Sequence, residues 1–184
     1  APLIYQFDRL TNQKGCTVPG SVASVGAGLV FFLSDDGFHM LKGNEIVSIG
    51  AEKVNKWFLK RFKIANKENM VASVDPMNQN VIWAYPNTDS EDGSNNEILI
   101  YNYNLNRWSY VEQSTTALAP LFLAGYTLEN LDNINSSIDS IPASLDDGIW
   151  KGGTFFFAGA KDKKVQSFTG DRLEATLETG EFDV

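Results

Sequence analysis

Short runs of apolar residues recur along the chain and are separated by segments rich in Gly, Asn, Asp and Ser. Some runs alternate from side to side: in the segment EILIYNYN, Ile98 and Ile100 face opposite Leu99 and Tyr101. A period of two residues is typical of a half-buried β-strand. Turn-forming residues recur about every ten positions, which favours many short strands over long helices. The pattern therefore predicts an all-β fold.

The runs of strand length fall into three similar units. The first contains SVASVG, LVFFLS, GFHMLKG and EIVSIG, and the second contains MVASVDP, VIWAYP, EILIYNYN and RWSYVE. The third contains LFLAGY, TFFFAG, KVQSFTG and RLEATLETG. In every unit the second run is the most apolar and carries aromatic residues, as a strand covered on both faces does. We expect about three four-stranded antiparallel blades, at residues of about 21–50, 69–113 and 118–179.

A tight turn precedes the last run of each unit, at Gly43-Asn44, Leu105-Asn106 and Gly170-Asp171. Gly and Asn tolerate the positive φ that a two-residue hairpin requires. The first and third turns therefore predict two-residue hairpins. Leu105 suits such a turn less well and predicts a loop of three or four residues.

The segment between the first two units has a helical period instead. Its apolar residues fall on one helical stripe and are Val54, Trp57, Phe58 and Phe62. A stripe of this width is typical of a helix that packs on a core. We expect one short helix near 51–62.

Four-stranded units bury their faces on neighbouring units, which favours a single propeller-type domain over residues 1–184. Three blades are too few to close a ring. The chain is therefore a partial or small β-propeller: either a fragment of a longer propeller, or one whose residues 1–20 and terminal GEFDV add a fourth sheet. A β-sandwich is the structural alternative.

Composition narrows the classes of function. With 184 residues, 43% of them hydrophobic, the chain is able to bury a sizeable core. Its net charge of −8 argues against a surface that grips phosphates. No apolar run approaches the length of a membrane helix, so no membrane partner is expected. The single cysteine, Cys16, rules out an internal disulfide and is expected to pack as a small apolar residue.

Catalytic and cofactor signatures are missing from the sequence. The single histidine, His39, lies in the alternating run GFHML, where a structural role is the default. One His and one Cys do not assemble a zinc site or a serine-type triad. No glycine-rich nucleotide loop occurs. The sequence predicts a protein that is not an enzyme and that has no catalytic residue, metal site or cofactor.

Paired acids leave one enzymatic alternative, because glycosidases need only two carboxylates about 5 to 10 Å apart. The pairs are Asp35 with Asp36, Glu91 with Asp92, and Asp146 with Asp147. Each pair stands beside a Gly in an expected hairpin tip, where Asp is favoured because it bonds the turn backbone. The segment SDDGF approaches the Asp-box of sialidase-like propellers but is one residue short.

Two loops gather oxygen ligands without the EF-hand order that calcium binding would display: NTDSEDG at 87–93 and DNINSSID at 132–139. Asn135 also begins a formal glycosylation acceptor. Basic residues concentrate in one place, the expected helix, as Lys53, Lys56, Lys60, Arg61 and Lys63. A solvated face is the expected role of this basic set, and a docking surface for an acidic partner or a DNA backbone is the alternative.

The segment GCTVPGSVASVGAGLVFFLSDDGFHMLKGNEIVSIG, with VASVDPMNQNVIWAYP and EILIYNYNLNRWSYVE, resembles the tail nozzle proteins of short-tailed phages. These include the family called tail tubular protein B and its relatives named for stabilising packaged DNA. The resemblance covers roughly residues 15–112 well and the remainder loosely. The phrase YNYNLNRW is also similar to kelch blades.

The resemblance implies a structural component of a phage tail, made in the bacterial cytoplasm and located in the virion. It implies assembly into a homo-oligomeric ring with other tail proteins, the adaptor and the fibres, and passage of DNA through a channel without sequence-specific binding. An acidic wall suits such a channel, because a moving duplex must avoid strong local traps. A glycan-binding or glycan-cleaving propeller and a kelch-like protein interaction module are the alternatives.

Overall fold

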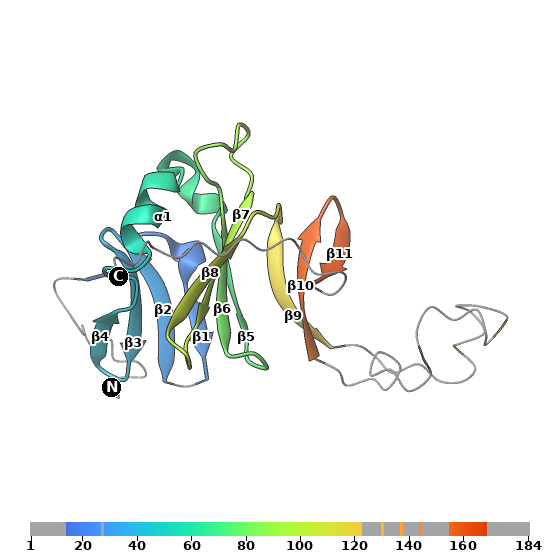
Figure 1. Ribbon diagram of the computed structural model, residues 1–184, viewed down its shortest axis with the longest axis horizontal. Coiled ribbons are helices and arrows are strands. Elements are labelled where there is room, and N and C mark those ends of the chain that lie inside the picture. Colours follow the sequence, from blue (N-terminus) through green and yellow to red (C-terminus); the bar gives the residue numbers. More distant parts are fainter. Residues whose placement is uncertain are drawn as a thin grey trace, which may run out of the picture.

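The computed structural model describes residues 14–26, 28–122 and 155–168, together with the single positions 130, 137 and 144. These residues form three antiparallel sheets, two of four strands and one of three, with one α-helix (Figure 1). The expected all-β class and the division into three antiparallel sheets are confirmed.

Sheet 1 is a simple meander of β1 (Ala23–Val25), β2 (Leu29–Ser34), β3 (Gly37–Lys42) and β4 (Glu45–Ser48). Two residues join β2 to β3, and the expected two-residue turn Gly43-Asn44 joins β3 to β4. Gly43 has a φ of 60°. A glycine adopts this conformation without steric cost, which explains how the strands reverse so tightly.

Sheet 2 repeats the meander with β5 (Val71–Asp75), β6 (Asn80–Tyr85), β7 (Glu97–Asn102) and β8 (Arg107–Val111). The loop between β7 and β8 has four residues, and Asn106 within it has a φ of 53°. The longer loop predicted from Leu105 is confirmed, because Asn, rather than Leu, occupies the left-handed position.

Sheet 3 contains β9 (Ala117–Phe122), β10 (Phe155–Lys161) and β11 (Lys164–Ser167). β9 begins four residues before the predicted run LFLAGY and includes Pro120, which an edge strand tolerates. Asp162 and Lys163 both have positive φ, so the β10–β11 hairpin closes without a glycine. The fourth strand predicted at 172–180 and the turn Gly170-Asp171 lie outside the described residues.

The predicted helix is α1 (Asn55–Arg61), which is shorter than the predicted 51–62. Val54, Phe58 and Phe62 of the predicted stripe are buried, whereas Trp57 is half-buried. Two 3-10 helices, η1 (Pro19–Ser21) and η2 (Ile64–Asn69), were not predicted. None of the helices in the described part of the chain has the length and apolar character needed to span a membrane.

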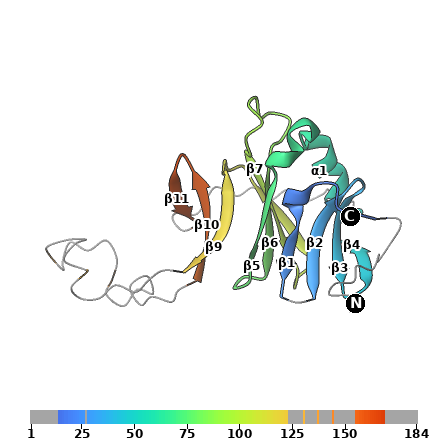
Figure 2. The ribbon, with the colours of Figure 1, turned by 180° about the vertical axis from the view of Figure 1, so that it is seen from behind.

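The three sheets stack face to face with sheet 2 in the middle, and their first strands lie side by side in the order β9, β5, β1 (Figure 2). The large core between sheets 1 and 2 contains Leu99 and Tyr101, and the smaller core between sheets 2 and 3 contains Ile98 and Ile100. The alternation predicted for β7 is thus confirmed. Stacked antiparallel meanders of this kind are consistent with a small propeller or with a β-sandwich.

Trp83 ties the first two sheets to η1. Its ring belongs to β6 and is fully buried. The ring centroid lies 5.8 Å from that of Trp108, on which it stacks, and 4.7 Å from that of Phe38 in sheet 1. Its indole N–H donates to the Ser21 carbonyl oxygen at 2.8 Å, and the Ser21 hydroxyl accepts from the Leu33 N–H at 2.8 Å. One short 3-10 turn is therefore bonded to both sheets.

Candidate functional site

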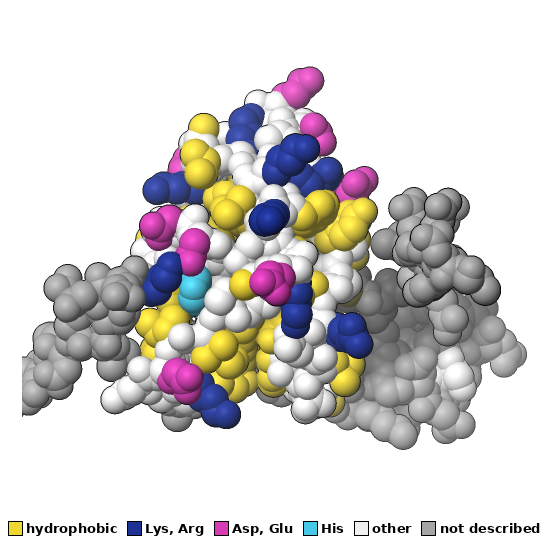
Figure 3. All heavy atoms as spheres, turned by 60° about the vertical axis from the view of Figure 1, so that its left-hand side comes forward, with side chains coloured by type: hydrophobic (Ala, Val, Ile, Leu, Met, Phe, Trp, Pro, Cys, Tyr) yellow, Lys and Arg dark blue, Asp and Glu magenta, His cyan; other side chains and the backbone are white. Residues whose placement is uncertain are grey.

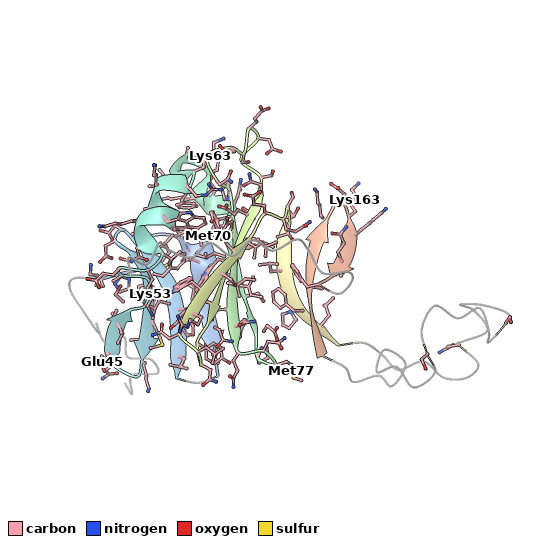
Figure 4. The ribbon with its side chains drawn as sticks, in the orientation of Figure 1. Glu45, Lys53, Lys63, Met70, Met77 and Lys163 are labelled. Atoms are coloured by element: carbon pink, nitrogen blue, oxygen red, sulfur yellow. The ribbon has the colours of Figure 1, made fainter. Side chains whose placement is uncertain are left out.

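The side of sheets 1 and 2 that carries α1 gathers most of the polar and aromatic groups that the sequence singled out. Figure 3 shows several Lys and Arg side chains in the upper part of this face, with hydrophobic and acidic side chains among them. Lys53 and Lys63 mark opposite ends of the helix (Figure 4). We describe the buried ionic network first, then two hollows, and then the predicted acidic pairs.

A buried carboxylate fixes the helix to sheet 2. Glu97, the first residue of β7, has 0% of its surface exposed. Its Oε1 accepts from Nη2 of Arg61 at 2.6 Å, and its Oε2 accepts from the Tyr85 hydroxyl at 2.5 Å. Burial, with the Glu97 hydrogen bond second, raises the pKa of Tyr85, while the Glu97 bond raises the pKa of Arg61. The arrangement keeps Arg61 charged and Tyr85 neutral.

An open hollow, here called the aromatic groove, lies between the start of the helix and β8. It has a volume of about 260 Å³ and is lined by Lys53, Val54, Trp57, Leu99, Trp108, Ser109 and Tyr110. The Trp57 and Tyr110 rings meet at 5.0 Å and 47°. Arg61 covers Trp57 at 5.1 Å from its ring centre. Because both rings are partly open to solvent, the groove offers a stacking surface beside positive charge.

A second hollow of about 230 Å³ lies between the end of β2 and the helical segment, where Val18, Leu33, Leu59, Phe62 and Ile64 provide an apolar lining. Asp35 and Lys67 are its charged lining residues. Nothing in the described residues indicates an occupant for this hollow, and we assign it no role.

The predicted basic set proves partly structural. Arg61 binds Glu97, the Lys63 amine donates to the Ser90 carbonyl oxygen, and the Lys53 amine donates to Asn106 Oδ1 at 2.8 Å. Lys56 and Lys60 are exposed, as the predicted solvated face requires. Three of the five basic residues therefore anchor the helical segment to sheet 2, Arg61 at the start of β7 and the two lysines at the loops.

His39 has the structural role that the sequence predicts by default. It is buried, stacks on Phe32 at 5.7 Å, and its Nδ1 lies 3.0 Å from the Gly37 carbonyl oxygen. Its Nε2 lies 3.7 Å from Oδ1 of Asp36. A ring held by its own hairpin and by an aromatic neighbour is not presented to a substrate.

The first acidic pair forms the two-residue tip of the β2–β3 hairpin. Asp35 Oδ1 accepts from the Ser34 hydroxyl at 2.9 Å, and this bond lowers the pKa of Asp35. Asp36 accepts from the Lys14 amine, which lowers the pKa of Asp36. Both carboxylates thus have hydrogen-bond partners, a hydroxyl of the same hairpin and the amine of Lys14, and stay ionised.

The second pair lies in the long β6–β7 loop. The Asp92 Oδ1 accepts from the Ser94 N–H at 2.9 Å, which is the main reason that the pKa of Asp92 is lowered. In the same loop Oδ1 of Asn87 accepts from the Asp89 N–H at 2.8 Å and from the Asn96 amide at 2.7 Å. The side-chain oxygens of Asn87, Ser90 and Asp92 are therefore used within the loop, and the described residues contain no cluster that suits a metal ion.

Several predicted groups fall beyond what the structure describes, namely Asp146, Asp147, Asn135 and nearly all of DNINSSID. Cys16 is described, and the expectation that it packs in the core is wrong. The thiol is exposed and lies 3.1 Å from the Val18 carbonyl oxygen. It stands before the first strand, outside the stack, where no apolar neighbours enclose it.

Sequence reasoning missed Glu97 and the aromatic groove. Glu97 begins an alternating strand and looks like an ordinary turn-flanking acid, while its partner Arg61 is 36 residues away. The groove had a weak signal, since Tyr110 of RWSYVE is a large aromatic in the outermost strand of its unit. No family model matches the sequence, and no curated protein matches it.

Proposed function

We propose that the chain is a structural component of the tail of a short-tailed phage, where it forms part of the DNA exit channel and works by assembly rather than by chemistry. The observation that carries this proposal is the composition of the three strands that lie side by side. β1, β5 and β9 read ASV, VASVD and ALAPLF and contain no Lys or Arg. A surface without cations gives phosphates no strong attachment point, which suits a duplex that must slide.

The outward faces of the end sheets support an assembly role. Side chains alternate across a strand, so residues next to those in the cores point away from sheet 2. On sheet 1 these residues include the apolar Val30, Phe32, Leu41 and Ile46, with the polar His39 and Ser48 among them. On sheet 3 they include the apolar Ala117, Ala119, Ala160 and Val165, the last with 65% of its surface exposed. Closed propellers have about four to eight blades, so a three-sheet stack offers such faces to further sheets.

The state of the acids supports a role without catalysis. Glycosidase chemistry needs one carboxylic acid with a raised pKa to protonate the leaving group. The pKa values of Asp35, Asp36 and Asp92 are instead lowered by local hydrogen bonds. Among the described acids, these pairs therefore suit turn stabilisation better than glycan cleavage.

Electron microscopy of the purified full-length gene product tests the proposal. We expect rings with a central channel, and we expect Ala119→Arg on the outward face of sheet 3 to abolish them. Asn104→Arg, which introduces the same side chain in an exposed loop of sheet 2, is the control and leaves the rings intact. The proposal is contradicted if the unaltered protein is monomeric, or if rings still form with Ala119→Arg. A stable complex with one host protein would instead favour the kelch-like alternative.

A further inference from the structure

We propose that the aromatic groove is a binding site for an acidic sugar residue of a polysaccharide. This goes beyond the proposed role in assembly, because the groove lies on the outer strand β8 and the helix rather than on the outward faces of the stack. Three features carry the inference: the geometry of the two rings, the free Tyr110 hydroxyl, and the local charge.

The rings form an angled platform. Tyr110 has 54% of its surface exposed, and its ring meets Trp57 at 47°. The apolar C–H face of a pyranose packs on such rings, because aromatic side chains present a large, rigid apolar surface. One side of Trp57 is already covered by Arg61, and the two rings touch, so no parallel slot remains for a planar base. The platform therefore suits a puckered sugar better than a nucleobase.

One polar group is free at the same hollow. The Tyr110 hydroxyl has no hydrogen-bond partner among the described residues, whereas the side chain of its neighbour Ser109 points to the opposite face of β8. Small-molecule sites commonly combine an apolar wall with a few such donors and acceptors, which fix the orientation of the ligand. The volume of about 260 Å³ is sufficient for one sugar ring, and the hollow is open, so the rest of a polysaccharide extends into solvent.

The local charge is opposite to that of the whole chain. The protein carries a net charge of −8, yet Lys53 lines the groove. Arg61 lies over its Trp57 wall, but the Arg61 charge is already paired with Glu97. Lys56 and Lys60 are exposed on the same short helix. Glu112 lies 3.9 Å from Arg61 but is mostly exposed, so water screens most of its effect. A carboxylate on the ligand would complement this positive edge, which selects an acidic sugar over a neutral one.

Competing ligands fit the groove less well. Binding of single-stranded nucleic acid uses several stacking rings along a basic track, about 4 to 16 nucleotides long. The groove has three aromatic residues, Trp57, Trp108 and Tyr110, but they line a single hollow rather than a track along which successive bases stack. A peptide adding to the free edge of β8 would need the backbone of that strand but not its aromatic side chains. Substitutions of the rings therefore separate a sugar from a peptide.

Titration calorimetry of the full chain tests the proposal. The probes are oligosaccharides of hyaluronan, alginate, polygalacturonate and polysialic acid, each of six sugars, with cellohexaose as the neutral probe. We expect at least one acidic probe to bind and cellohexaose to bind about tenfold more weakly or not at all. Tyr110→Ala and Lys53→Met are each expected to weaken binding about tenfold.

Matched substitutions on sheet 3 serve as controls. Phe168→Ala removes an aromatic ring with 50% exposure, close to that of Tyr110, and Lys164→Met removes an exposed charge. Both are expected to leave binding unchanged. The proposal is overturned if none of the acidic probes binds, if Tyr110→Ala binds as well as Phe168→Ala, or if a twelve-nucleotide oligo(dT) displaces the bound sugar at lower concentration than the sugar itself.

Discussion

The Arg61–Glu97 contact joins the helical insertion to sheet 2, and its loss is expected to be costly. In Arg61→Met the buried carboxylate of Glu97 would keep the Tyr85 hydroxyl but lose its positive partner. Methionine retains most of the length of the arginine stem, so packing against Trp57 is largely preserved. The substitution therefore removes mainly the charge.

The size of the effect follows from burial on each side of the pair. Removing one partner of a fully buried pair costs about 3 to 5 kcal/mol, because an unpaired charge remains inside. Glu97 has no exposed side-chain surface, but Arg61 has 31% exposed, so water reaches part of the contact. We therefore expect a loss of about 2 to 3 kcal/mol in the free energy of unfolding, which lowers Tm by roughly 4 to 12 °C in a chain of this size.

Urea unfolding followed by tryptophan fluorescence measures this loss, because Trp83 is buried between sheets 1 and 2. Arg107→Met removes an exposed arginine from β8 and is the matched control, with an expected change under about 0.5 kcal/mol. In the double variant with Glu97→Gln, much of the lost stability is expected to return, since no buried charge remains. The reasoning is refuted if Arg61→Met is as stable as Arg107→Met, or if the two substitutions are strictly additive.

Three further outcomes test other parts of the structure. Asn55→Ala should lower the free energy of unfolding by about 1 to 3 kcal/mol in thermal denaturation, because the buried Asn55 amide bonds backbone groups of the β2–β3 hairpin on both sides; an unchanged Tm would contradict this. Burial and the Glu97 hydrogen bond raise the pKa of Tyr85 in the folded state. The contribution of Tyr85 to the free energy of unfolding is therefore fully present below its pKa in the unfolded chain, about 10, and falls as the pH rises beyond that value. Tyr85→Phe should flatten this alkaline decline in urea titrations from pH 8 to 11, and an equally steep decline would count against it. The Ser94 N–H lowers the pKa of Asp92, so the contribution of Asp92 to stability is present above a pH of about 4 and is lost as the pH falls further. The stability of Asp92→Asn should therefore decline less steeply in acid than that of the unaltered protein.

The sheets could be predicted because their signals are local. LVFFLS and VIWAYP carry the dense apolar runs of strands covered on both faces, and both are the second strands of their sheets. The helix was equally visible, since three of its four stripe residues are buried. Its exact start was not, because Val54 precedes α1 without a side-chain cap to mark the boundary.

The site was harder to predict because its residues meet through packing between distant segments. Glu97 and Arg61 belong to different elements, and nothing near either one indicates that the carboxylate is buried. Trp57 was assigned to the core stripe, but the register of β8 brings Tyr110 beside it and leaves both rings partly open. Sequence periodicity identifies which face a residue occupies, but not what stands opposite that face.

The two cores flanking sheet 2 are unequal in size, so we expect local stability to differ between the two ends of the stack. Among the described side chains, the first two sheets share Trp83, several aromatic rings and the bonds of η1, whereas sheet 3 contributes Phe157 to the smaller core. Local opening begins where the fewest apolar side chains interlock, so β9–β11 are expected to separate from the other sheets first. In the proposed ring, the more stable sheets would keep their shape while sheet 3 adjusts to a neighbour.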